Sequence, residues 1–107
     1  MKLRWSLRAL DRALEAKAFI AADDPRAADR WATGLVDAVA KLKRLPKLGR
    51  MVPEIRQEEY RELIYGNYRV VYRVAEKTIS ILTVRHYSRR FDPAELDESD
   101  RKTEEPT

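Results

Sequence analysis

Residues 60–91, YRELIYGNYRVVYRVAEKTISILTVRHYSRRF, decide the fold that we expect for this chain. They read as three consecutive strands joined by tight turns, at residues 60–65, 68–74 and 78–87. Gly66-Asn67 suits a two-residue hairpin, because glycine adopts positive φ without steric cost and asparagine tolerates it. Glu76-Lys77 is a weaker turn, since it lacks glycine. The third strand is apolar on both faces, which favours a place inside the sheet.

Side chains alternate along the second of these strands. One face carries only tyrosine and valine, namely Tyr68, Val70, Tyr72 and Val74. The other carries two arginines on either side of a valine, namely Arg69, Val71 and Arg73. The first face is the better core, so the second is expected to be an open sheet face. On that open face, solvation and anion binding are equally good interpretations of Arg69 and Arg73.

Two helices are expected before the three strands. Residues 2–5 form a short strand candidate, and Ser6 stands at the N-cap of a helix over residues 7–22. Its apolar side chains recur at spacings of three and four and predict one stripe facing the sheet: Leu7, Leu10, Leu14 and Ala18. Asp24 caps a second helix over residues 25–44, which begins with Pro25.

The second helix has its own apolar stripe, formed by Trp31, Leu35, Ala38, Val39, Leu42 and Leu45. Trp31 is interpreted as a packing residue. Pro46 and Gly49 end this helix, and residues 51–59 carry the chain irregularly to the first of the three strands. The order β-α-α-β-β-β predicts a two-layer α+β domain. An N-terminal strand and a helical hairpin pack on one face of a small antiparallel sheet.

Charge divides the chain into a basic body and an acidic tail. Residues 1–91 contain 20 Lys and Arg against 11 Asp and Glu, a net charge of +9, whereas residues 92–107 contain 2 against 7, a net charge of −5. We therefore expect one domain over residues 1–91 and a flexible tail over residues 92–107, with one helical turn near residues 94–96. The basic body favours an anionic partner, either nucleic acid or an acidic protein segment.

Composition excludes several classes of protein. There is no cysteine and one histidine, so no thiolate or multi-histidine metal site is expected, and no cofactor motif appears. No apolar run approaches the roughly 20 residues of a membrane helix, and the N-terminus lacks the apolar stretch of a signal peptide. We expect a cytoplasmic protein without a membrane partner.

Two kinds of function then remain for this chain: metal-free chemistry that uses cationic side chains, or binding of a partner without chemistry. Metal-free RNA cleavage needs a proton acceptor, a proton donor and cations around the phosphate. His86 can be the acid or the base, and arginines can hold the phosphate: Arg69, Arg73, Arg89 and Arg90. Tyr68 or Tyr87 can stack on a base. A lone histidine at a strand end is more often structural than catalytic.

From Trp5 to about Arg90, the sequence resembles the RelE/ParE superfamily of toxins from bacterial type II toxin–antitoxin systems. The resemblance is carried by the order and spacing of short motifs: Trp5-Ser6 with Ala9, Pro25-Arg26-Ala27-Ala28, Pro46-Lys47-Leu48-Gly49-Arg50, Arg61-Glu62-Leu63, Tyr68-Arg69-Val70-Val71-Tyr72-Arg73-Val74 and Ile81-Leu82-Thr83-Val84-Arg85-His86. The fold of that family, a helical hairpin on an antiparallel sheet, agrees with the pattern of the residues.

The resemblance implies one of two activities. RelE-like members cleave mRNA on the ribosome, and ParE-like members poison DNA gyrase without catalytic chemistry. Arg69 matches the RelE-like arginine after the hairpin tyrosine, Arg89 falls near the second catalytic arginine, and Arg61 stands roughly where RelE-like members carry lysines. No tyrosine follows Arg90, so the general base or stacking residue of the RelE-like pattern is missing. The sequences RELIYGNYRVVYRV and ILTVRH also resemble ParE-like members more closely.

The favoured hypothesis is thus a gyrase-directed toxin that forms a hetero-oligomer with a cognate antitoxin. The alternative is a ribosome-dependent endoribonuclease that uses Arg69, His86 and Arg89. In either case Arg61, Arg73 and Arg90 are candidates to bind an anion or the target. A third hypothesis is a chain without toxicity. The resemblance places the antitoxin on the helical hairpin and the open sheet edge.

Overall fold

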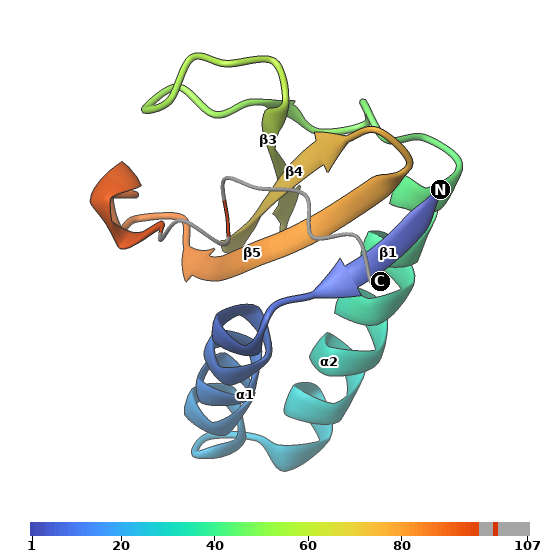
Figure 1. Cartoon of the computed structure of the whole chain (residues 1–107). Helices are drawn as coiled ribbons and strands as arrows, with labels where there is room; N and C mark the ends of the chain where they lie inside the picture. The colour runs from blue at the N-terminus through green and yellow to red at the C-terminus, as the bar shows by residue number, and fades with distance from the viewer. Residues whose placement is uncertain (97–99, 101–107) are drawn as a thin grey trace.

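The fold is seen in a computed structural model that describes residues 1–96 and residue 100. Its elements are β1 (Lys2–Trp5), α1 (Leu7–Ala21), α2 (Pro25–Ala40), the short 3₁₀ helix η1 (Lys41–Lys43), β2 (Arg50–Met51), β3 (Tyr60–Tyr65), β4 (Tyr68–Ala75), β5 (Thr78–His86) and the 3₁₀ turn η2 (Pro93–Glu95). Figure 1 shows α1 and α2 side by side on one side of the sheet. The predicted two-layer α+β architecture is confirmed.

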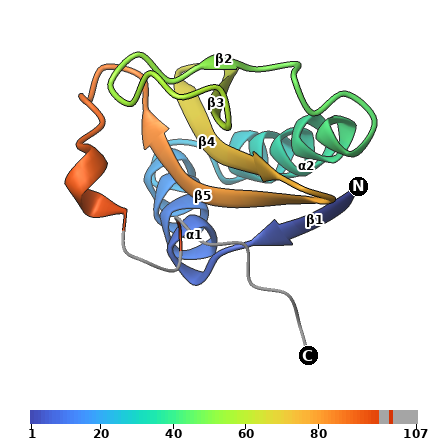
Figure 2. The same ribbon diagram turned by 45° about the horizontal axis from the view of Figure 1, so that its top comes forward.

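The sheet has five strands in the order β1-β5-β4-β3-β2, which can be followed from edge to edge in Figure 2. The three strands of the decisive stretch form an antiparallel meander as predicted, and Gly66 has the positive φ of 57° that its turn requires. The sheet is mixed, however, because β1 runs parallel to β5. Parallel pairing needs a long connection, and the chain between β1 and β5, which includes both helices and the strands β2 to β4, is long enough.

Both predicted helix starts are confirmed by hydrogen bonds. The Ser6 hydroxyl accepts from the amide of Ala9 at 3.0 Å, and the Asp24 carboxylate accepts from the amides of Arg26 and Ala27 at 3.1 Å. These contacts satisfy amides that have no partner inside the first helical turn. The second helix ends at Ala40 and tightens into η1, so the predicted end at residue 44 lies one 3₁₀ turn too far.

The main core lies between the helices and the sheet. Its fully buried members come from both layers: Ala9, Leu35, Val39, Leu42, Val70, Tyr72, Ile79, Ile81 and Val84. Trp31 packs against this cluster, as predicted. The register of β4 against β5 shifts once, between Val71 and Tyr72, but each strand still has one side toward the helices and one side away from them. The shift returns Val84 to the helix side, where it faces Val70.

The predicted leucine stripe of α1 is wrong as a core face. Leu7, Leu10 and Leu14 are 80%, 44% and 63% exposed. The buried residues of α1 are instead Ala9 and Ala16. Alanine has the small side chain that a close approach to α2 and the sheet requires, so the alanine face packs inward and the leucines cover the outside of the molecule.

The expectation of an open second sheet face is also wrong. A second apolar cluster covers it, formed by Val52, Tyr60, Val71, Leu82, Phe91 and Leu96. Phe91 and Leu96 belong to the segment after β5, which includes the expected helical turn as η2. The segment supplies the apolar cover that this face needs. The flexible tail was predicted over residues 92–107. Its residues 92–96 include η2 and Leu96, and its residues 97–99 and 101–107 lie outside the described residues.

Candidate functional site

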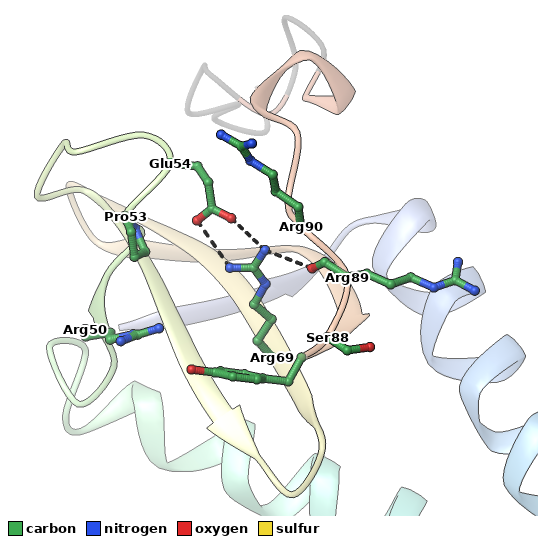
Figure 3. Close-up of a pocket in the computed structure, with 8 residues that line it drawn as sticks. Arg50, Pro53, Glu54, Arg69, Ser88, Arg89 and Arg90 are labelled. Carbon is green, nitrogen blue, oxygen red and sulfur yellow. Dashed lines mark hydrogen bonds and ion pairs between the residues drawn. The ribbon is translucent and has the colours of Figure 1, made fainter.

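Arg69 lies at the centre of a charged network on the second sheet face. Its side chain is 6% exposed, so the prediction of a solvent-facing arginine is wrong. The guanidinium donates to both carboxylate oxygens of Glu54, at 2.8 and 3.2 Å, and to Glu62 at 3.0 Å. A fourth hydrogen bond, drawn in Figure 3, reaches the carbonyl of Arg89 at 3.2 Å. The two terminal nitrogens of Arg69 therefore make all four of these hydrogen bonds to the protein itself, and its buried Nε has no partner among the described residues.

Two glutamates neutralise the arginines of this network. Glu62 is fully buried and also accepts from Arg50, at 2.9 Å from Nε and 2.8 Å from Nη2. Its hydrogen bond and charge raise the pKa of Arg50. Burial disfavours charged Arg69, but the hydrogen bonds and charges of Glu54 and Glu62 outweigh burial and raise its pKa.

Glu54 connects the network to the segment after β5. Its carboxylate accepts from the amide of Phe91 at 3.1 Å, in addition to the two bonds from Arg69. The hydrogen bond from Arg69 is the main cause that lowers the pKa of Glu54. The ionised carboxylate thus fixes the backbone at Phe91, whose ring lies 5.7 Å from the Arg69 guanidinium carbon.

Two cavities adjoin this network, and both are lined by Arg50 and Tyr87. The polar one, about 360 Å³, is lined further by Glu54, Arg69 and Arg90, together with Pro53, Ser88 and Arg89. The apolar one, about 280 Å³, is lined further by Ile64, Gly66 and Asn67. We call the two together the Arg50–Tyr87 groove. It is a candidate binding site because exposed cations and an apolar surface meet there.

His86 lies on the other face of the sheet from Arg69. Its ring stacks edge-on against Tyr68 at 5.2 Å, and Tyr68 in turn contacts Trp31 at 5.1 Å on the helix side. The Nδ1 atom of His86 lies 2.7 Å from the Ser88 hydroxyl. In Figure 3 the Arg89 side chain points away from Arg69. The structure therefore does not bring the side chains of Arg69, His86 and Arg89 to one point.

The other three arginines singled out by the sequence are also placed apart. Arg61 donates to the carbonyl of Gly49 at 2.9 Å, which holds the loop before β2. Arg73 pairs with Glu59 at 2.9 Å and lies over the ring of Tyr60. Arg90 is exposed and lines the groove. Of the three, only Arg90 is in position to contact a ligand in the groove.

The glutamates were missed by sequence reasoning, although one of them had a signal. The Gly66-Asn67 turn sets Ile64 opposite Arg69. Glu62 lies two residues before Ile64 and therefore on the same face of the sheet as Arg69. Glu54 had no such signal, since it lies in an irregular loop. Across residues 1–96 and 100, no three carboxylate or histidine side chains are grouped to hold a metal ion, and no helix is long and apolar enough to cross a membrane.

Comparisons with known proteins agree with this fold. A sequence model described as the ParE toxin of the type II toxin–antitoxin system parDE matches residues 3–91. A Sinorhizobium fredii protein named "Putative toxin Y4kP" is 39% identical over 87 residues, which span 79% of this chain and 86% of that protein.

Three solved structures are similar in fold. The chromosomal ParDE toxin–antitoxin system of P. aeruginosa superposes with a TM-score of 0.67 at 21% identity, covering 80% of this chain and 95% of that one. The RelBE2 toxin–antitoxin complex of Mycobacterium tuberculosis gives 0.57 at 22% identity, covering 79% and 95%. A YoeB/ParE toxin from Agrobacterium tumefaciens gives 0.56 at 24% identity, covering 80% and 98%.

Proposed function

The chain belongs to the ParE toxin family of type II toxin–antitoxin systems, and from this membership we propose that it acts by binding DNA gyrase and is neutralised by a cognate antitoxin. The toxin would inhibit gyrase as a binding protein, with no cofactor and no bond-breaking step of its own. Its place of action is then the cytoplasm, where gyrase works.

The observation that carries the proposal is the occupation of Arg69. An RNA-cleaving site needs free cations and proton-transfer groups around one phosphate. Here Glu54 and Glu62 already bind the Arg69 guanidinium, and a phosphate would have to displace two carboxylates from it. His86 lies on the opposite face of the sheet. This arrangement supports a toxin that binds its target over one that cleaves RNA.

An antitoxin partner is part of the same proposal. The P. aeruginosa and M. tuberculosis structures are described as a toxin–antitoxin system and a toxin–antitoxin complex. This chain has a net charge of +9 over residues 1–91, which suits an acidic partner. The exposed leucines of α1 offer an apolar surface of the kind that an amphipathic partner covers.

The test is a short pulse of expression without antitoxin, followed by two parallel measurements. Plasmid supercoiling reports gyrase activity, and the integrity of a translated mRNA reports ribonuclease activity. We expect relaxed plasmid and intact mRNA. Cleaved mRNA with normal supercoiling would overturn the proposal in favour of a ribosome-dependent endoribonuclease. Normal growth with both readouts unchanged would mean that the chain is not toxic.

A variant in the core provides the matched control. Val70 is fully buried in the main core, so Val70→Asp introduces an unpaired charge there and should prevent folding. Expression of this variant must leave both readouts unchanged. An effect that persists with Val70→Asp would come from overexpression itself and not from the folded toxin.

A further inference from the structure

We propose that residues 91–96, together with Asp100, form a cover that opens while the rest of the domain stays folded, and that the sheet face beneath it then becomes accessible to anions. We call these residues the C-terminal cover. The inference concerns the chain alone and is independent of the target on which the chain acts. The family match ends at residue 91, so membership of the family does not by itself imply such a cover.

The C-terminal cover is attached to the sheet by side chains and not by strand pairing. Phe91 and Leu96 are buried in the second apolar cluster, at 0% and 5% exposure. The backbone hydrogen bonds that residues 92–96 form with other described residues are local and close the single turn η2. One 3₁₀ turn has little stability of its own, so the cover stays closed only through its side-chain contacts.

Two carboxylates of the cover contact arginines of the body. Glu95 pairs with Arg85 on β5, and Asp100 pairs with Arg8 on α1 at 2.7 Å. The side chains of Arg85 and Asp100 are 15% and 4% exposed, so each pair is partly removed from water. Opening of the cover takes both carboxylates away from these arginines. The uncovered face is therefore more positive than the covered one.

The cover begins at the Arg69 network. The amide of Phe91 donates to the Glu54 carboxylate at 3.1 Å, and the Phe91 ring lies 5.7 Å from the guanidinium carbon of Arg69. Arg69 also donates to the carbonyl of Arg89, two residues before the cover, at 3.2 Å. Movement of Phe91 would take its ring off the guanidinium. The exposure of Arg69 thus depends on the cover as well as on the glutamates that bind this arginine.

The two sides of β4 belong to different apolar clusters, which allows one side to open alone. Val70 lies in the main core under the helices, and the next residue, Val71, lies in the second cluster with Phe91 and Leu96; both valines are 0% exposed. Within the described part of the chain, the sheet and the main core include no residue of the cover. Segments held by few contacts open at a lower free energy than the core. We therefore expect Val71 to become accessible while Val70 stays buried.

The experiment uses single thiols, because the chain contains no cysteine of its own. Val71→Cys places a thiol under the cover, and Val70→Cys places the same group on the opposite face of the same strand. Both full-length variants react with an excess of a small thiol reagent, and mass spectrometry follows the rate. Each rate is divided by the rate of the same variant unfolded in urea. We expect Val71→Cys to react at least about tenfold faster than Val70→Cys.

Low concentrations of urea separate local from global opening. The Val71→Cys rate should rise less steeply with urea than the Val70→Cys rate, because opening of the cover exposes less surface than unfolding of the domain. Leu35→Ala weakens the main core, which stays folded when the cover opens. This substitution should accelerate the Val70→Cys reaction at least about tenfold and leave the Val71→Cys reaction within about twofold.

Two substitutions in the cover test the contacts that hold it closed. Leu96→Ala should accelerate the Val71→Cys reaction at least about tenfold, since it removes a buried side chain from the closed state alone. Glu95→Gln removes the charge that pairs with Arg85 and should accelerate the reaction about fivefold. Asp37→Asn, at an exposed position on α2, is the matched control and should stay within about twofold.

The charge of the reagent tests access by anions. A methanethiosulfonate that carries a sulfonate and one of similar size that carries an ammonium group modify the same thiol. At low ionic strength the sulfonate reagent should modify folded Val71→Cys about threefold faster than the ammonium reagent, after division by their rates with the unfolded variant. This preference should shrink as salt is added, because mobile ions screen the arginines.

Equal rates for Val71→Cys and Val70→Cys, or an equal response of both to Leu35→Ala, would mean that the segment opens only when the whole domain unfolds. Either result would overturn the cover, as would a lack of response to both Leu96→Ala and Glu95→Gln. A preference for the ammonium reagent would overturn access by anions. These measurements contain no gyrase, so their failure leaves the proposed function intact. Failure of the expression test leaves the thiol rates unchanged.

Discussion

Glu62 and Arg69 form an ion pair under the sheet, with 3.0 Å between Oε1 and Nη1 and side-chain exposures of 0% and 6%. The pair joins neighbouring strands β3 and β4, and Glu62 extends it to Arg50 on β2. The stability of the folded chain depends on keeping such a buried ion pair intact, since removal of one charged side chain leaves the other buried and uncompensated.

Glu62→Gln should therefore lower the free energy of unfolding by about 3 kcal/mol. The amide keeps the shape of the side chain but leaves the charges of Arg50 and Arg69 without this partner. Urea unfolding followed by circular dichroism measures the change. Glu58→Gln, at an exposed position, is the matched control and should stay within about 0.5 kcal/mol. Equal effects of the two substitutions would contradict a stabilising role for the buried pair.

Stability should also depend on pH through Glu54. Its pKa in the folded chain is lowered from the ordinary value of 4.5 by the hydrogen bond from Arg69. The stabilisation is therefore fully present above pH 4.5 and is lost as the pH falls toward the lowered folded pKa. Unfolding of the native chain and of Glu54→Gln, measured from pH 7 to pH 3, should show a difference that shrinks as the pH falls. A constant difference would exclude this linkage.

Leu14 and Leu35 should respond very differently to the same substitution. Leu35 is 2% exposed in the main core, so Leu35→Ala should cost about 2–5 kcal/mol. Leu14 is 63% exposed on α1, and Leu14→Ala should cost less than about 1 kcal/mol. Thermal or urea unfolding of both variants compares them directly. A large loss for Leu14→Ala would mean that the leucine stripe packs against the body after all.

Gly49 is required by a close approach of two backbone segments. A Cβ atom at this position would lie 2.5 Å from the carbonyl oxygen of Glu62 and 2.7 Å from the Tyr72 hydroxyl. That hydroxyl accepts from the Gly49 amide at 2.9 Å and donates to the carbonyl of Pro46. Gly49→Ala should cost about 3 kcal/mol because the backbone must move.

Gly66→Ala gives the comparison for Gly49. A Cβ at Gly66 meets nothing, but the residue has a φ of 57°, so the strain should cost about 1 kcal/mol. Unfolding measurements on the two alanine variants should therefore rank Gly49 well above Gly66. The opposite order would show that turn conformation outweighs packing here.

His86→Ala should leave toxicity unchanged if the chain acts on gyrase by binding. The ring contacts Tyr68 and Ser88 at the end of β5, on the face opposite Arg69. Removal of the ring takes away an edge-on aromatic contact worth about 1 kcal/mol. It leaves the arginines that line the groove unchanged, because His86 does not line either cavity. Growth arrest and plasmid supercoiling after an expression pulse measure the effect. Loss of toxicity in a folded His86→Ala variant would favour the ribonuclease alternative.

Much of the fold follows from local patterns. The Gly66-Asn67 turn and the alternation around Val70 and Tyr72 determined the meander and the face that meets the helices. Ser6 and Asp24 determined where the helices begin. These features were predictable because each rests on residues close in sequence, whose conformational preferences act over a few positions.

The candidate site was less predictable, since its residues come from separate segments. Arg50 and Tyr87 were both visible as residue types, but only folding brings them to one groove. Arg69 was identified, and its neutralisation by Glu54 was not, because Glu54 lies in an irregular loop that carries no periodic signal. Contacts of this kind depend on the path of the loop through space.

The sequence by itself determined the order of the elements, the helix starts, the hairpin register and the basic character of the body. Tertiary structure decided which side of α1 is buried, since an apolar stripe predicts burial only when its side chains fit the available distance. There Ala9 and Ala16 fit and Leu14 does not. It also decided that Phe91 and Leu96 cover the second face. Whether Arg69 meets solvent or two carboxylates depends on that cover, because a guanidinium removed from water must find its partners within the protein.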